Sequence, residues 1–293
     1  MFYEAFVRTV LHITKPINSH LTVKAARFSQ NALLAPMLRA FKAHPTFTVK
    51  QLESSSLVIA DSTGTREKPY IALYIHGGAY TAGGMGYVEG VAGTLTCKLG
   101  ITVAGSVYRL APENPFPCSL YDAYESYCFL ISSGYSPENI VLIGESAGGG
   151  LIFALCDMLK EKGLKQPRCA VVMSPWTDLT FSGESLKTNK HKDPSISEKY
   201  LRHAAKLYTN GVSPSDPHIS TIFADSTGFP KTLIFVGSDE ILLSDAENMR
   251  ANLSSHGVEN ELITGERMWH AYPLFNTRYD SEIFTKIKAF IEL

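Results

Sequence analysis

The chain has 293 residues, of which 45% are hydrophobic and 19% charged, and this balance excludes a disordered chain and supplies enough apolar side chains for a large core. The formal net charge of -1 argues against a nucleic-acid-binding protein. No apolar run approaches the roughly 18 residues that a membrane-spanning helix needs, so we expect no transmembrane segment.

The N-terminal part of the chain is basic although the whole chain is nearly neutral. Residues 1–50 contain seven Lys or Arg residues against one acid, Glu4. Two interpretations stay open: a solvated helix face, or a basic amphipathic segment that contacts membrane surfaces or anionic substrates. Glu4 and Arg8 interrupt any signal-peptide core, so secretion is not expected.

The five cysteines are widely spaced and form no Cys-x-x-Cys pair. This usage predicts free thiols in a reducing compartment, and therefore a cytoplasmic protein, rather than a disulfide framework or a structural zinc site.

Short apolar or β-branched runs recur along the chain without polar alternation, which is typical of strands covered on both faces of a parallel sheet. The predicted strands are residues 71–76, 101–107, 139–144, 169–174, 232–237 and 259–264. Helical patterns follow or separate them at about residues 85–99, 119–133, 147–162, 242–256 and 278–292. The alternation predicts an α/β fold with a mostly parallel, doubly wound sheet and helices on both faces.

Two segments do not follow this alternation, residues 1–45 and 180–225. Insertions of this kind often cover the ligand crevice at the carboxyl ends of the strands. We therefore expect one domain over residues 1–293, in which these two segments form a cap on a core of residues 46–179 and 226–293.

The motif Gly144-Glu-Ser146-Ala-Gly148 lies between a predicted strand and a predicted helix. A serine on such a strand-turn-helix corner is lifted above the sheet, and glycines on either side permit the strained backbone and the close approach of helix to strand. The spacing excludes a dinucleotide-binding glycine motif and a phosphate-binding loop. Ser146 is therefore the candidate nucleophile, and the backbone N–H of Ala147 is a candidate oxyanion donor.

A serine nucleophile needs a base, and the base needs an orienting carboxylate. Among the histidines after Ser146, His270 follows the predicted strand 259–264 by a short loop, which places it at the carboxyl edge of the sheet. Asp239 directly follows the strand 232–237 and is the preferred acid, with Asp245 in the next helix as the alternative. Gly78 and Ala79 in HGGAY are further candidate oxyanion donors, because this glycine-rich loop follows an early strand.

Six motifs in this order resemble one family. They are HGGAY (76–80), YRLAPENPFP (108–117), GESAGGG (144–150), SPWTDLT (174–180), GSDEILLSDA (237–246) and MWHAYPLF (268–275). Together they are similar to the hormone-sensitive lipase-like group of α/β-hydrolases, the bacterial family IV type of carboxylesterase. The resemblance implies the same nucleophile, base, acid and oxyanion donors: Ser146, His270, Asp239, Gly78, Ala79 and Ala147. It also implies a cap built from the N-terminal segment and the insertion before Asp239.

The chain departs from this family at two positions, where Ala79 replaces a usual glycine and Glu145 a usual aspartate. Glu145 is interpreted as a structural acid. Aromatic and sulfur-containing side chains near the motifs are candidates for a substrate pocket, and equally for the core: Tyr80, Met85, Tyr87 and Trp269.

We therefore predict a serine carboxylesterase that hydrolyses short- to medium-chain esters through an acyl-enzyme, with no metal and no organic cofactor. A lactone or amide hydrolase and a lipase acting at lipid surfaces are alternatives within the fold, and a ligand-binding pseudo-hydrolase is the non-enzymatic one. A small-molecule ester is the expected partner, and the sequence leaves both a monomer and a homodimer open.

Overall fold

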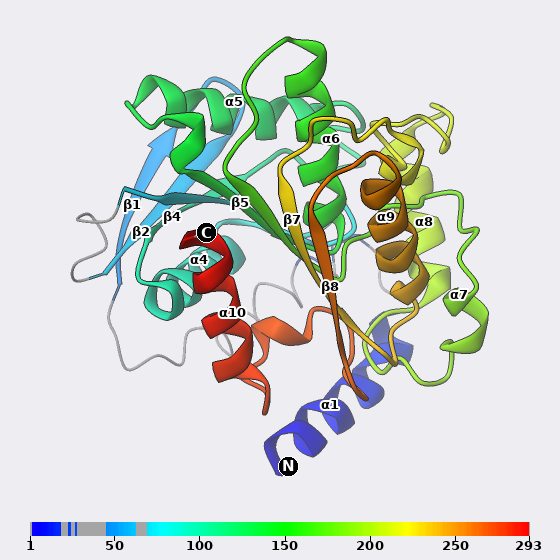
Figure 1. The fold of residues 1–293 in the computed structure, drawn as a ribbon. Helices are drawn as coiled ribbons and strands as arrows, with labels where there is room; N and C mark the ends of the chain where they lie inside the picture. The colour runs from blue at the N-terminus through cyan, green and yellow to red at the C-terminus, as the bar shows by residue number, and fades with distance from the viewer. Residues whose placement is uncertain (1, 19–22, 25–26, 28–44, 63–68, 293) are drawn as a thin grey trace.

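The computed structural model describes residues 2–18, 23–24, 27, 45–62 and 69–292, and its centre is one eight-stranded sheet (Figure 1). The strand order is β1-β2-β4-β3-β5-β6-β7-β8. The strands are β1 (Thr46–Gln51), β2 (Ser56–Asp61), β3 (Ile71–Ile75), β4 (Thr102–Val107), β5 (Ile140–Glu145), β6 (Cys169–Met173), β7 (Lys231–Gly237) and β8 (Asn260–Gly265). Strand β2 pairs antiparallel with β1 and β4, and the other pairs are parallel.

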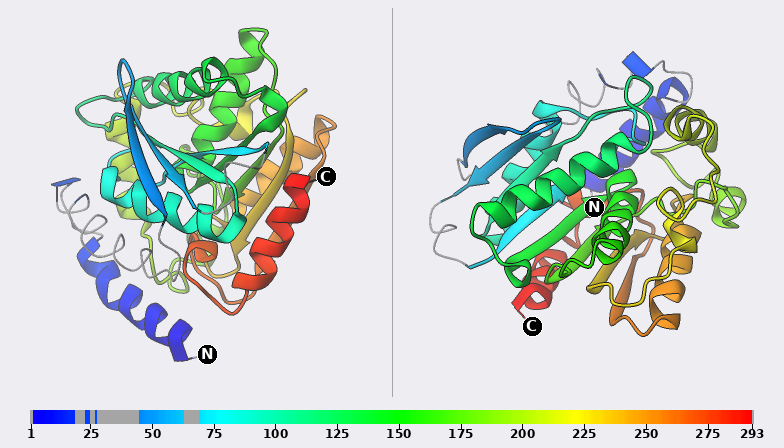
Figure 2. Two further views of the ribbon diagram at one scale, coloured as in Figure 1. Left: turned by 90° about the vertical axis from the view of Figure 1, so that its left-hand side faces the viewer. Right: turned by 90° about the horizontal axis from the view of Figure 1, so that it is seen from above.

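Helices cover both faces of this sheet (Figures 1 and 2). The α-helices are α1 (Phe2–Asn18), α4 (Met85–Leu99), α5 (Cys118–Ser132), α6 (Ala147–Glu161), α7 (Ser185–Thr188), α8 (Glu198–Thr209), α9 (Leu243–Ser255) and α10 (Asp280–Glu292). The described residues also include three short 3-10 helices: η3 (Pro137–Asn139), η4 (Thr221–Phe223) and η5 (Tyr272–Leu274). Helices α4 and α10 share one buried apolar cluster, and α5, α6, α8 and α9 share the other.

Strand β3 shows why both faces need cover. Its side chains alternate between the two clusters, with Leu73 in the cluster of α5, α6 and α9 and Tyr74 in the cluster of α4 and α10. All five of its residues are buried. A strand with apolar residues at every position can bury them only if helices pack on both sides of the sheet.

The predicted α/β fold is confirmed, and each of the six predicted strands and five predicted helices is found to within two residues at either end. Strands β1 and β2 were not predicted. Strand β1 is exposed along its whole length, so it lacks the apolar run that marked the others.

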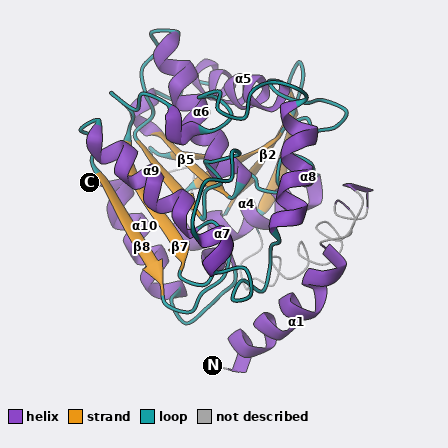
Figure 3. Ribbon diagram, turned by 90° about the vertical axis from the view of Figure 1, so that its right-hand side faces the viewer, coloured by secondary structure: helices purple, strands orange, loops and turns teal. Residues whose placement is uncertain are grey.

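The two segments assigned to a cap are described to different extents. Residues 180–225 contain α7, α8 and η4, and Figure 3 shows α7 and α8 on the same side of the molecule as α9. In the N-terminal segment, residues 2–18 form α1, and much of the remainder lies outside the described residues. None of the described helices combines the length and the apolar character needed to cross a membrane.

Gly148, in the first turn of α6, sets how closely this helix approaches β3. A Cβ atom added there would lie 2.1 Å from the carbonyl oxygen of Ile75, far inside van der Waals contact. Because the obstacle is backbone in the middle of the sheet, it cannot move aside cheaply.

We expect Gly148→Ala to lower the free energy of unfolding by about 3 kcal/mol or more, through overpacking between α6 and β3. Gly163→Ala is the matched control, because Gly163 has a φ of +65° but nothing within 4 Å of an added Cβ. Backbone strain alone should cost the control about 1–2 kcal/mol. Urea unfolding measures both, and equal losses would contradict the proposed close approach.

Candidate active site

Ser146 lies on a strained corner between β5 and α6, with φ 55° and ψ -123°. Non-glycine residues rarely adopt this region, which costs about 1–3 kcal/mol and is typical of functional sites. A Cβ on Gly144 would lie 2.9 Å from the backbone of Gly148, so the corner requires glycine on both sides of the serine. The predicted roles of Gly144 and Gly148 are therefore confirmed.

Backbone hydrogen bonds hold this corner in place. The N–H of Ser146 donates to the carbonyl of Met173 at 3.0 Å, and the N–H of Trp176 donates to the carbonyl of Ser146 at 2.9 Å. Ala147 is the first residue of α6, so its N–H belongs to the positively polarised end of the helix. The serine is thus held at a place where an adjacent anion is stabilised.

His270 lies after β8 and contacts a carboxylate from the loop after β7. Its Nδ1 is 2.8 Å from Oε2 of Glu240, whose side chain is fully buried. The other oxygen of Glu240, Oε1, accepts a hydrogen bond from the N–H of Gly237 at 2.7 Å. A carboxylate at Nδ1 favours the tautomer that carries its proton there, which leaves Nε2 free to accept one.

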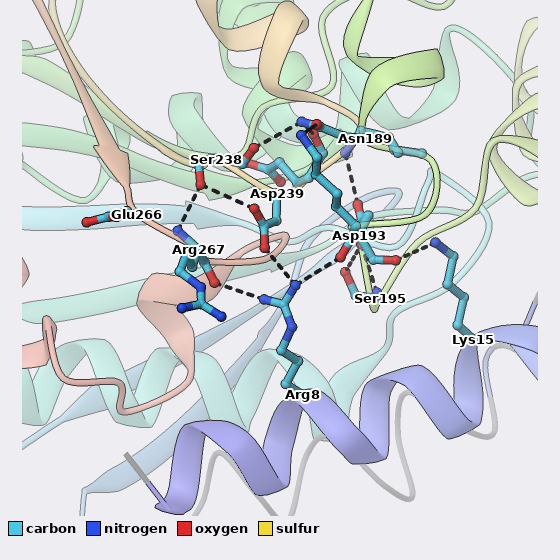
Figure 4. Close-up of polar contacts among 12 residues, drawn as sticks. Arg8, Lys15, Asn189, Asp193, Ser195, Ser238, Asp239, Glu266 and Arg267 are labelled. Atoms are coloured by element: carbon cyan, nitrogen blue, oxygen red, sulfur yellow. Dashed lines mark hydrogen bonds and ion pairs between the residues drawn. The ribbon is translucent and has the colours of Figure 1, made fainter.

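The prediction that Asp239 is the partner of this histidine is wrong. Its Oδ2 accepts a hydrogen bond from Nη2 of Arg8 at 2.6 Å, as Figure 4 shows. The alternative Asp245 is also used elsewhere, because its Oδ2 accepts from the N–H groups of Thr177 and Asp178. Asp239 and Glu240 both lie in the turn after β7, but only Glu240 contacts His270. The sequence offered one signal for Glu240, because it is adjacent to Asp239 in the motif GSDE (237–240).

The Glu240 carboxylate changes the basicity of His270. Burial lowers the pKa of the imidazole, but the hydrogen bond and the charge of Glu240 outweigh it, so that the pKa lies above its usual 6.5. Burial raises the pKa of Glu240 against the opposing effect of the imidazole. The pair therefore forms a buried, charge-assisted contact at the carboxyl edge of the sheet.

The HGGAY loop after β3 is a tight turn with three successive residues at positive φ: Gly78 at 116°, Ala79 at 52° and Tyr80 at 60°. The carbonyl of Gly78 accepts from the N–H groups of Thr81 and Ala82, at 3.0 and 2.9 Å. These bonds hold the turn in one conformation. Ala79 and Tyr80 are strained where glycines would not be, which adds two unfavourable backbone conformations to that of Ser146.

Glu145 lies beneath this loop and ties it to the corner. Its Oε1 accepts from the N–H of Gly77 at 2.6 Å and from the hydroxyls of Tyr74 and Tyr87, each at 3.0 Å. Burial raises the pKa of Glu145 to about 7, although these hydrogen bonds favour the charged form. The interpretation of Glu145 as a structural acid is confirmed, since its carboxylate binds the backbone of Gly77 in the HGGAY loop.

His76, which opens the loop, also serves structure. Its ring stacks on Tyr108 with centroids 4.0 Å apart, and its Nδ1 lies 2.6 Å from the carbonyl of Gly77. Burial lowers the pKa of His76 to about 4, so the ring is neutral near pH 7.

The predicted pocket residues pack in the interior. Tyr80 stacks on Tyr208 with centroids 3.8 Å apart, and Tyr87 donates to Glu145. Met85, the first residue of α4, is partly buried, and Trp269 is 1% exposed. Contact between any of them and substrate stays a prediction. Arg109 of the motif YRLAPENPFP pairs with Asp122 of α5 at 2.7 Å, and this contact ties the motif to that helix.

Among the described residues, one group of side chains has the spacing of a metal site. Asp157, Glu161 and His218 bring one ligand atom each within 4.8 Å of one another. Asp157 and Glu161 lie at the opposite end of α6 from Ser146, and Lys160 is 3.3 Å from Asp157. None of these three residues belongs to the Ser146 corner or to the His270–Glu240 pair.

Comparison with known proteins gives a consistent answer. Residues 72–274 match a family described as the alpha/beta hydrolase fold. The chain is 30% identical over 278 residues to an esterase of Acinetobacter venetianus, covering 94% of this chain and 89% of the esterase. It is 34% identical over 200 residues to an acetyl-hydrolase of Streptomyces hygroscopicus, covering 68% and 67%. The crystal structure of a hormone-sensitive lipase homologue from a metagenome library superposes with a TM-score of 0.89 at 31% identity, covering 99% of both chains.

We expect Glu240→Gln to lower the pKa of His270, because the amide removes the negative charge that favours the imidazolium. Asp239→Asn should change this pKa less, since that carboxylate contacts Arg8. NMR titration of the imidazole nitrogens in both variants measures the two shifts. A larger shift in Asp239→Asn would contradict the observed pairing.

Proposed function

Because this chain belongs to the α/β-hydrolase family and is a carboxylic ester hydrolase of the hormone-sensitive lipase group, we propose that Ser146, His270 and Glu240 are its catalytic triad. The observation that carries the proposal is the 2.8 Å contact of His270 with the buried Glu240, at the sheet edge where β5 delivers the strained Ser146. Nucleophile, acid and base then occur in the chain order typical of this fold.

In the proposed reaction, Nε2 of His270 takes the proton of the Ser146 hydroxyl as its oxygen attacks the ester carbonyl. The carbonyl oxygen becomes an oxyanion, for which we propose the N–H groups of Gly78, Ala79 and Ala147 as donors. The alcohol leaves with the proton from His270. Water then attacks the acyl-enzyme by the same route, releasing the acid and restoring Ser146. Glu240 stabilises the imidazolium formed in both halves.

We expect Ser146→Ala to lower kcat for a chromogenic short-chain ester by about three powers of ten or more, because the acyl-enzyme cannot form. The variant should also resist a serine-directed phosphonate that labels the wild-type protein. Mass spectrometry of the labelled protein identifies the modified residue. Phosphonate on another residue, or wild-type turnover by pure Ser146→Ala, would contradict the proposed nucleophile.

For the substrate, we propose esters with short to medium acyl chains. The acetyl-hydrolase relative is named for the shortest common acyl group, and one of the similar solved structures, at 27% identity, was soaked with p-nitrophenyl butyrate. The bulky side chains Tyr80, Trp176 and Tyr208 are buried close to the Ser146 corner, which favours a short acyl group. Lactones and amides remain alternatives, because the same serine chemistry serves them.

We expect kcat/KM for p-nitrophenyl esters to be highest at two to about six acyl carbons and to fall at least tenfold by about twelve, as the cavity excludes longer chains. Initial rates below the solubility limit of each ester measure this series, with Ser146→Ala as the blank. A maximum at twelve carbons, or a rise in rate above the solubility limit, would favour the lipase alternative.

The division of the chain stays a proposal: residues 1–45 and 180–225 form the cap, and the remainder forms the core. A cytoplasmic location, and a monomer or homodimer, likewise stay predictions. For the basic N-terminal segment, we favour an internal role over membrane contact, since Arg8 and Arg27 are engaged within the protein.

A further inference from the structure

Some of the basic residues in positions 1–50 bind other parts of the protein, and the proposed reaction alone does not account for these contacts. Two of these residues, Arg8 and Arg27, direct their guanidinium groups into the protein and bind loops far away in sequence. We call these two side chains the N-terminal clamp.

Arg8, on α1, binds three loops at once (Figure 4). Its Nη1 donates to the carbonyl of Arg267 at 2.9 Å, and its Nη2 donates to Asp239 at 2.6 Å and to the carbonyl of Lys192 at 3.1 Å. Asp239 directly precedes Glu240, and Arg267 lies three residues before His270. One planar guanidinium therefore joins the two loops that carry the proposed acid and base.

The Lys192 loop reinforces the same turn from the other side. Asn189 donates from Nδ2 to the carbonyls of Ser238 and Glu240, each at 3.0 Å, and Oδ2 of Asp193 accepts from the N–H of Ile241 at 3.0 Å. Lys15 of α1 in turn donates to the carbonyl of Asp193. The turn that holds Glu240 is thus bound by both halves of the proposed cap.

Arg27 makes the corresponding contacts with the oxyanion loop. Its Nε donates to the carbonyl of Thr81 at 2.8 Å, its Nη2 donates to the carbonyl of Ala111 at 2.9 Å, and it pairs with Glu113 at 2.6 Å. The N–H of Ala111 donates to the carbonyl of Tyr80 at 2.9 Å. Arg27 therefore binds the oxyanion loop just after Gly78 and Ala79. It also binds Ala111, which is itself hydrogen-bonded to that loop.

We propose that Arg8 and Arg27 are positioning residues for ester hydrolysis: Arg8 aligns the loops of Glu240 and His270, and Arg27 aligns the oxyanion loop. The inference rests on the proposed triad. Neither arginine touches the reacting atoms in this scheme, so their loss should slow the chemical step with little effect on substrate binding. Small misplacements of catalytic groups are sufficient for this, since about 1 Å can cost a hundredfold in rate.

The test compares Arg8→Met, Asp239→Asn, the double variant and Arg8→Lys in steady-state hydrolysis of a short-chain p-nitrophenyl ester. We expect Arg8→Met to lower kcat about tenfold while KM changes less than about twofold. The double variant should lose no more than Arg8→Met alone, because Arg8→Met already removes the Arg8–Asp239 contact that Asp239→Asn weakens. Arg8→Lys should recover part of the rate, since an ammonium can still bind some of the three acceptors.

Lys165→Ala is the matched control. It removes an exposed ion pair with Glu138, 3.1 Å long, in the connections that precede β5 and β6, and it should keep wild-type kcat and KM. Arg27→Met tests the second half of the clamp and should also lower kcat selectively.

Two results would overturn the clamp: wild-type kcat in Arg8→Met, or independent, additive losses in the double variant. If Arg8→Met does not fold, Arg8→Lys and Asp239→Asn carry the test together, and wild-type kcat in both would have the same meaning. These outcomes differ from failure of the proposed function, in which the wild-type protein itself releases no chromophore and takes no phosphonate label.

Discussion

The close approach of α6 to β3 is the constraint from which the rest of the active site follows. This approach is possible because Gly148 has no Cβ, which would otherwise collide with the carbonyl of Ile75. That contact holds the first turn of α6 under the end of β5, and Ser146 is left in a backbone conformation that a free chain avoids. The unfavourable conformation persists because the sheet and the helix, both deeply buried, offer no alternative.

The same corner positions the oxyanion loop through Glu145. This buried carboxylate joins the residue before the serine to the start of the loop after β3, because its Oε1 accepts hydrogen bonds from the N–H of Gly77 and from two tyrosine hydroxyls. A buried carboxylate is costly unless it is hydrogen-bonded, so its presence indicates that the position of the loop matters. The two halves of the candidate site, nucleophile and oxyanion donors, are therefore one connected unit.

The base and acid belong to a separate unit, at the ends of β7 and β8. The loops there are longer and less regular than the Ser146 corner, and their alignment depends on contacts from outside the sheet. Asn189, Asp193 and Arg8 supply these contacts from segments distant in sequence. In the proposed scheme, a cap that includes the N-terminus would therefore serve catalysis without contributing a reacting group.

The sequence by itself determined the six strands β3 to β8, their covering helices, and the candidate nucleophile and base. Periodicity and glycine spacing act over a few residues, Ser146 directly follows one predicted strand, and His270 follows another by a short loop. It could not distinguish Asp239 from Glu240. Both follow β7, and which one faces His270 depends on a turn whose direction is set by distant partners, with Arg8 holding one carboxylate outward. The edge strand β1 and the use of the basic N-terminal segment were also decided only by tertiary structure. Strand β1 is exposed along its length and has no apolar run, and the ion pair of Arg8 with Asp239 joins residues more than 200 positions apart, so neither leaves a local pattern in the chain.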